Sequence, residues 1–195
     1  MELPQALKAW DRFWFAPVDP RALAAMRISL GLLLLSWWVS MGAALPLLHI
    51  EGPFDAHLMD TYWTEWRVRL LEGLTPGQLH QLWLGGFVVL GAFTVGLGTR
   101  LSNLLTLVLL VAVWHRAPWI HNGGDRLLRI WTLSLLLSPS GAIWSVDAQL
   151  RQRLGVEPVR QVPILAIRLV QIQLVVMYTA TGLEKLLGGP EWLAG

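Results

Sequence analysis

Polar residues recur at helical spacing in an otherwise apolar stretch between residues 163 and 187. Gln171, Tyr178 and Lys185 follow one another at intervals of seven, so on a helix they lie close to one line. Arg168 precedes Gln171 by three residues and Thr181 follows Tyr178 by three, which widens the line into a stripe. A lysine within hydrocarbon costs roughly 2.5–3.5 kcal/mol, so such residues usually face a bundle interior or a wet cavity. The stripe therefore predicts a helix face that other segments cover.

Lys185 is the residue of this stripe that could carry a reaction. In a desolvated site near the end of a helix it could act as a base toward a lipid-soluble acid, with Tyr178 orienting that ligand and Glu184 beside it in the sequence. The alternative is a lysine at the end of a membrane span whose ammonium group extends to the headgroups. The residues alone leave both interpretations open.

A second polar cluster occupies the stretch from Trp119 to Arg129. A pair of glycines makes a flexible turn there, and Asn122 or Asp125 can cap the helix that follows. Asp125 and Arg129 are four residues apart, which predicts an ion pair on one helix face. A cap and this ion pair could account for the cluster, but Arg126 and His121 make it denser than simple capping requires, so a role in binding an anion or in holding a site closed stays open beside that explanation. Its candidate site residues are His121, Asn122, Asp125, Arg126 and Arg129.

Composition decides the broad class of the protein. Of its 195 residues 54% are hydrophobic and only 14% are charged, against about 25% charged residues in soluble domains. We therefore expect a polytopic membrane protein whose main partner is the lipid bilayer. The net charge of +2, with scattered basic residues, argues against nucleic-acid binding. The chain has no cysteine, and His57 near Asp55 lacks further ligands, so no metal site is expected.

The apolar runs predict an all-α fold, a polytopic transmembrane helix bundle of about five spans with amphipathic helices at the membrane interface. The spans are expected at about residues 21–44, 79–97, 101–116, 125–138 and 163–187. The interfacial helices are expected at residues 3–16 and 56–71, where aromatic and charged residues alternate.

Smaller features complete this expectation. Asp19 is expected to cap the first span and Pro46 to close it, while Arg27 inside it extends to the headgroups. The glycines of the second span are expected to allow close helix packing. Residues 140–162 are expected to form a polar linker.

The distribution of basic residues predicts the orientation. With five spans, more of the Lys and Arg residues outside the spans fall on the side of the N-terminus than on the other side, so the positive-inside rule places that terminus in the cytoplasm. The turn at His121–Asp125 and the end of the last span at Lys185 then both lie toward the extracytoplasmic face. This convergence predicts a site.

Several motifs resemble those of one family. The stretch WIHNGGDRLLR from Trp119 to Arg129 resembles the signature turn of the horizontally transferred transmembrane (HTTM) domain, the family of bacterial relatives of the vitamin K-dependent gamma-carboxylase. The opening RFWFAPVDP, residues 12–20, with Arg27 after it, is similar to the start of that family. The stretches WSVD at 144–147 and YTATGLEKL at 178–186, then Trp192 and Gly195, resemble the carboxylase itself.

The resemblance implies a chemistry for Lys185. This residue matches the carboxylase lysine that deprotonates reduced vitamin K, after which oxygenation gives a strong base that removes a gamma-proton from glutamate before CO2 adds. Reduced vitamin K or another quinone is thus the implied cofactor, and a lyase the implied enzyme class. The carboxylase histidine has no counterpart within Asn122–Asp125; His121 is only adjacent.

The resemblance also implies a bacterial inner-membrane protein. Residues 1–195 are expected to form a single, C-terminally incomplete domain, so a partner chain or a missing C-terminal region would cover the polar stripe. Two functions stay open: a membrane enzyme that binds a lipid-soluble ligand, and a non-catalytic scaffold whose stripe packs on other helices. A transporter is disfavoured because the chain shows no inverted repeat.

Overall fold

The computed structural model describes residues 4–48 and 70–188, and this part of the chain is almost entirely helical, which confirms the predicted all-α fold. The only strands among these residues, β1 and β2, are two residues long and pair antiparallel, with Pro17 opposite Pro163. The elements are α1 (Gln5–Phe15), β1 (Pro17–Val18), α2 (Arg21–Met41), η1 (Gly42–Ala44), α3 (Leu45–Leu48), α5 (Pro76–Val95), α6 (Thr99–Arg116), η2 (Pro118–Ile120), α7 (Gly123–Leu136), α8 (Val146–Arg153), β2 (Val162–Pro163) and α9 (Leu165–Leu187).

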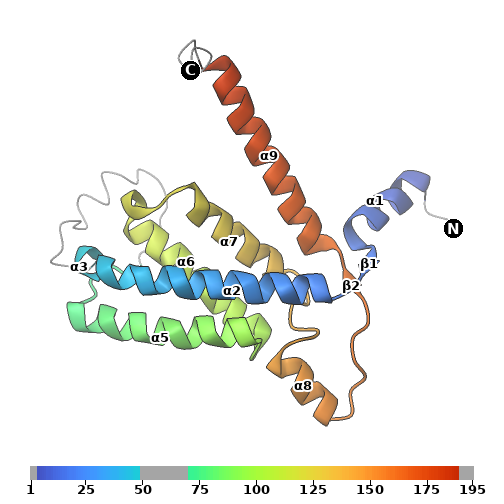
Figure 1. The fold of residues 1–195 in the computed structure, drawn as a ribbon, viewed down its shortest axis with the longest axis horizontal. Helices are drawn as coiled ribbons and strands as arrows, with labels where there is room; N and C mark the ends of the chain where they lie inside the picture. Colours follow the sequence, from blue (N-terminus) through green and yellow to red (C-terminus); the bar gives the residue numbers. More distant parts are fainter. Residues whose placement is uncertain (1–3, 49–69, 189–195) are drawn as a thin grey trace.

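Four helices form a bundle. α2 packs against α5 and α7, and α6 packs against the same two helices from the other side (Figure 1). Leu34, Leu90 and Phe93 are completely buried between them. The outer faces are apolar as well, with Val88 73% and Leu101 63% exposed. Helices that are apolar all round suit a bundle surrounded by lipid.

Three segments of the described part are long and apolar enough to span a membrane: Arg21–Leu48, Pro76–Val95 and Leu165–Leu187. Helices α6 and α7, with 18 and 14 residues, complete the bundle beside them, so a count of about five spans is consistent with the structure. The expected end of the first span at Pro46 is wrong. The helical path continues through η1 into α3, where Pro46 lies in the first turn and its missing N–H costs nothing.

Close contacts join α2 and α5. The indole of Trp38 donates to the carbonyl of Trp83 at 2.8 Å, and the indole of Trp83 donates back to the carbonyl of Trp38 at 2.9 Å. A Cβ at Gly86 would overlap the Trp38 ring, so only glycine allows this approach. A Cβ at Gly85 or Gly91 would meet no atom within 4 Å. The packing role predicted for the glycines of the second span therefore holds at Gly86 and not at these two.

The helix boundaries follow local sequence signals. Thr75 and Gln78 form a capping box at the start of α5, which ends at Gly96 in the left-handed conformation. The Asp19 carboxylate accepts from the backbone N–H of Arg21 at 2.8 Å, although Pro20 occupies the N-cap position expected for Asp19. The predicted interfacial helix at 3–16 is α1. Its partner at 56–71 and His57 lie outside the described residues, apart from 70 and 71, which are in a turn.

Residues 140–162 are not simply a linker. Ser145 accepts from the N–H of Ala148 at 2.9 Å and starts α8, a helix that the sequence analysis missed. The side chains of α8 are mostly polar, so no apolar periodicity indicated a helix there. The Ser145 cap instead fixes where this helix begins.

α9 differs from the bundle helices. Its first turns pack against α7 and α1, where Arg168 donates to the carbonyl of Phe13 at 3.3 Å. Beyond them it rises away from the bundle (Figure 1). Only 6% of its membrane-length window is buried. The predicted cover of its polar stripe is thus absent from the part of the chain that the structure describes.

Candidate functional site

The start of α7 gathers the second polar cluster. Asn122 and Asp125 form a capping box: the backbone N–H of Asn122 donates to Asp125 Oδ2 at 2.8 Å, and the N–H of Gly124 donates to Asn122 Oδ1 at 2.7 Å. The same Asp125 oxygen lies 3.2 Å from His121 Nδ1. One carboxylate therefore both starts the helix and holds an imidazole ring.

His121 and Asp125 form a buried dyad, with side chains 5% and 11% exposed. The His121 ring lies beside the indole of Trp37 on α2, with ring centroids 6.2 Å apart. Burial lowers the pKa of His121 below its ordinary value, although the Asp125 carboxylate opposes the shift. Among the described residues Nε2 makes no hydrogen bond of good geometry, although the Val113 backbone carbonyl lies near the ring and, like Asp125, favours its protonated form. A neutral ring that donates Nδ1–H to Asp125 presents the Nε2 lone pair as an acceptor.

The two arginines of this cluster point elsewhere. Arg129 lies over the Trp114 ring, 4.1 Å from its centroid, and Arg126 is exposed. The predicted ion pair between Asp125 and Arg129 is wrong, since no such contact occurs within 4 Å in the described residues and His121 and Asn122 occupy the carboxylate instead. Stacking on an indole is an alternative way to hold a guanidinium at a partly buried position.

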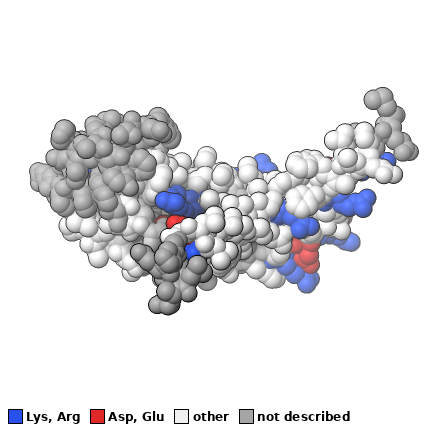
Figure 2. Space-filling view, turned by 90° about the horizontal axis from the view of Figure 1, so that it is seen from above, with Lys and Arg blue, Asp and Glu red and all other residues white. Residues whose placement is uncertain are grey.

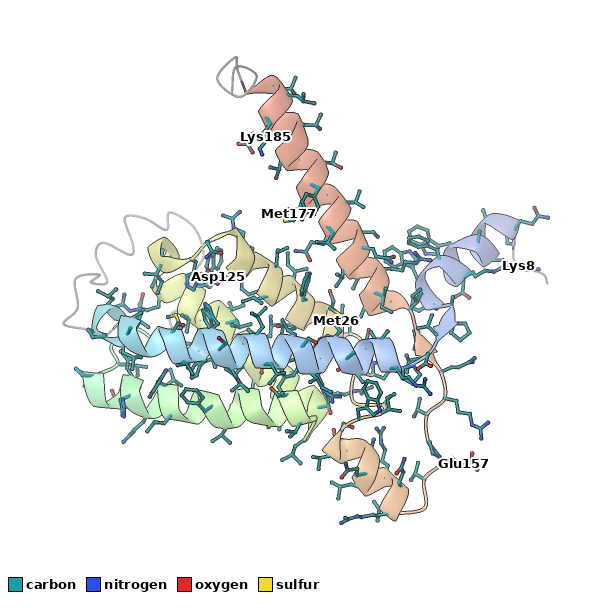
Figure 3. The ribbon with its side chains drawn as sticks, viewed as in Figure 1. Lys8, Met26, Asp125, Glu157, Met177 and Lys185 are labelled. Carbon is teal, nitrogen blue, oxygen red and sulfur yellow. The ribbon has the colours of Figure 1, made fainter. Side chains whose placement is uncertain are left out.

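The candidate residues of α9 do not meet this cluster. Gln171 accepts from Arg168 at 2.9 Å, near the base of the helix. Tyr178 is 70% exposed, and Glu184 and Lys185 are exposed further along. In Figure 3, Lys185 lies near the far end of α9, well apart from Asp125. The structure thus brings His121, Asn122 and Asp125 together and leaves Lys185 at a separate position, because α9 is packed only at its beginning.

Comparison with known proteins decides the family. The family model described as the HTTM domain matches residues 15–195, nearly the whole chain.

The chain belongs to the HTTM domain family.

No curated protein and no solved structure matches it at a significant level. Within the described residues, this HTTM protein has no group of three or more histidines and carboxylates that could hold a metal ion.

The HTTM protein also holds a buried charge that sequence reasoning placed wrongly. Arg27 does not extend to the headgroups; its side chain is completely buried. Its guanidinium donates to the backbone carbonyls of Thr94, Ser140 and Trp144. The planar guanidinium spreads five donors over three nitrogens and so reaches carbonyls on different sides, whereas a lysine has three donors on a single nitrogen. The sequence does show an arginine within an apolar run, which is the signal for a buried charge. It does not show the partners, because the carbonyls that accept from Arg27 lie in segments distant in the sequence.

Asp147 joins the same end of the bundle. Its carboxylate accepts from the backbone N–H of Gly98 at 2.8 Å and from the N–H and hydroxyl of Thr99, both at 2.7 Å. Burial alone would raise the pKa of Asp147, but these hydrogen bonds and the charge of Arg151 outweigh it and lower the pKa. In this HTTM protein Asp147 therefore ties the linker onto the end of α5, where its N–H donates to the Gly96 carbonyl, and onto the start of α6.

Proposed function

We propose that this HTTM-family membrane protein binds a hydroquinone or a related lipid-soluble acid along α9, and that Lys185 removes its proton. The observation that carries the proposal is the exposed polar stripe on a helix of membrane length. Gln171, Tyr178 and Lys185 are all exposed on α9, where a molecule dissolved in the bilayer can reach them. The resemblance of Gly182–Leu186 to the carboxylase motif supports the same assignment.

The roles follow from chemistry. The Lys185 amine takes the phenolic proton, while the Tyr178 hydroxyl orients the ring by a hydrogen bond. With five spans, α7 and α9 would cross the bilayer in opposite directions, which would place the first turn of α7 and the last turn of α9 on the same face. Arg126 and Arg129 would then bind an anionic part of the ligand, or these two residues together with Asp125 would hold the site closed. The proposed location is the bacterial inner membrane, with the N-terminus cytoplasmic.

A second candidate function rests on the small buried fraction of α9, 6% of its membrane-length window. Glu184 and Lys185 within a span are costly beside lipid. A partner chain or a C-terminal region of the protein could cover them, which would make α9 a docking helix and the protein a non-catalytic scaffold.

The test is binding of a reduced quinone to the purified protein in detergent, with wild type beside Lys185→Ala and Lys185→Arg. Lys8→Ala, the other lysine of the chain, is the matched control. Saturable binding that both Lys185 variants lose, with unchanged thermal stability and unchanged binding by Lys8→Ala, supports the proposal. Equal binding by all variants refutes a role for Lys185. If folded wild type binds no quinone while Lys185→Ala weakens assembly with another chain, the scaffold function is the correct one.

A further inference from the structure

Trp144 has an unusual backbone conformation. It is the one residue other than glycine in the described part with a positive φ, +50°. This conformation costs an ordinary side chain roughly 1–2 kcal/mol, and such strain persists where the surroundings impose it. Here the Trp144 carbonyl accepts from Arg27, and the next residue, Ser145, caps α8. With the backbone held on both sides, the indole stays outside the bundle and is 57% exposed.

A cavity of about 540 Å³ lies beside this indole. It forms where the start of α2, helix α8 and the segment before β2 meet. Its polar lining is rich in N–H donors, with exposed side chains from all three segments: Arg21, Gln149, Gln152 and Arg160. Of the described residues that line it, Asp19 carries the only carboxylate, and this group already accepts from the Arg21 backbone and lies 3.7 Å from Arg21 Nε. The cavity is therefore suited to an anion.

The position of the cavity favours the headgroup of a lipid over a free anion as the group that it binds. It lies at the end where α2 and α9 begin, and the blue side chains are most numerous toward one end of the molecule in Figure 2, with an acidic group among them; Arg12, Arg21, Arg153 and Arg160 are exposed in the segments of this end. Tryptophan and arginine at the mouth of a span are typical of headgroup depth. The segment that follows α8 also exposes apolar side chains, Leu154 at 81% and Val156 at 50%. Acyl chains can use that surface, whereas free phosphate cannot.

We propose that this cavity binds the phosphate headgroup of an anionic phospholipid in the leaflet where α2 begins. Arg21 and Arg160 bind the phosphate oxygens from opposite segments, Gln149 and Gln152 donate to the headgroup, and the Trp144 indole lies at the boundary with the acyl chains. The site is independent of Lys185, which lies at the other end of α9.

The experiment is native mass spectrometry of the detergent-purified protein, titrated with phosphatidylglycerol and, separately, with phosphatidylcholine. The double variant Arg21→Gln/Arg160→Gln should bind phosphatidylglycerol at least about tenfold more weakly than wild type. Arg12→Gln/Arg153→Gln has the same net charge but changes exposed arginines outside the cavity, and its affinity should stay within about twofold. Phosphatidylcholine should bind weakly, and added inorganic phosphate should not displace the lipid.

Three outcomes of this titration would overturn the proposal. Equal losses in the two double variants would mean that surface charge alone attracts the lipid. Equal binding of phosphatidylcholine would mean that the site does not distinguish an anionic headgroup from a zwitterionic one. Displacement by inorganic phosphate would identify a site for a free anion.

Trp144→Gly provides a second, independent test. Glycine adopts positive φ without strain, so this variant should unfold at the same temperature as wild type or higher. Its affinity for phosphatidylglycerol should fall several-fold because the indole is gone. A stable Trp144→Gly protein with unchanged lipid affinity would show that the ring has no part in the site, and the proposal would fail.

Discussion

The guanidinium of Arg27, inside the first membrane helix, donates a hydrogen bond to the backbone carbonyl of Trp144, 117 residues further along the chain. The same group donates to Thr94 at the end of α5 and to Ser140 after α7. One side chain thus joins α2, α5 and the segment between α7 and α8. Because the Arg27 side chain is buried, water could not take its place as hydrogen-bond donor to these carbonyls if the side chain were removed.

Replacing Arg27 should destabilise the whole bundle. Arg27→Met retains the apolar stem but leaves buried carbonyls without donors, at about 1–3 kcal/mol for each group. Arg27→Lys should restore little, because an ammonium cannot reproduce the planar fork. Thermal unfolding in detergent measures the effect, with the exposed Arg21→Met as control. A variant Arg27→Met as stable as wild type would contradict a structural role for this arginine.

Asp147 should make stability depend on acidic pH. Its pKa is lowered in the folded protein, so the unfolded chain binds the proton more tightly. The stabilisation is therefore complete above the unfolded value of about 3.9 and is lost as pH falls through the lower folded pKa.

Asp147→Asn should lower stability near neutral pH by about 1–3 kcal/mol, because the N–H groups of Gly98 and Thr99 then donate to a neutral amide in place of a charged carboxylate. It should also flatten the acid limb of the stability profile. Unfolding temperatures measured between about pH 3 and 7 test both effects, and an identical acid limb in the variant would exclude Asp147 as its source.

His121 should make the stability of the protein depend on pH in a higher range than Asp147 does. Burial lowers its pKa in the folded state, so protonation favours the unfolded chain. Its neutral form stabilises the protein fully above the unfolded value of about 6.5, and that contribution is lost as pH falls toward the lower folded pKa. Wild type should therefore lose stability on going from about pH 7 to pH 5. His121→Gln should lose less over that range, whereas the exposed His80→Gln should behave like wild type.

Two adjacent glycines offer a matched pair of substitutions. Gly86→Ala places a methyl group into the Trp38 indole, so the two helices must separate, and we expect a loss of about 1–3 kcal/mol. Gly85→Ala meets no atom within 4 Å and should gain up to about 1 kcal/mol from helix propensity. Comparative thermal unfolding of the two variants checks the difference. Equal effects would mean that the contact of α2 with α5 is not as close as described.

The family and the helices were within reach of sequence reasoning because their signals are local. A continuous apolar run predicts a membrane helix wherever it occurs, and caps such as Asn122 with Asp125 act within one turn. α1, α5, α6, α7 and α9 were predicted for this reason, and the stretch at residues 119–129, which suggested the HTTM family, is equally local.

Partners that come from distant segments were decided only by the tertiary structure. An arginine in an apolar run is compatible with headgroups or with buried carbonyls, and only the packing of α2, α5 and α7 places three carbonyls around Arg27. The Asp125 carboxylate could pair with Arg129 or with His121, and the position of Trp114 under Arg129 favours the second. The polar stripe of α9 is encoded by its heptad spacing. Its exposure follows from how few turns of that helix pack on α7, because spacing along one helix carries no information about which neighbour will cover it.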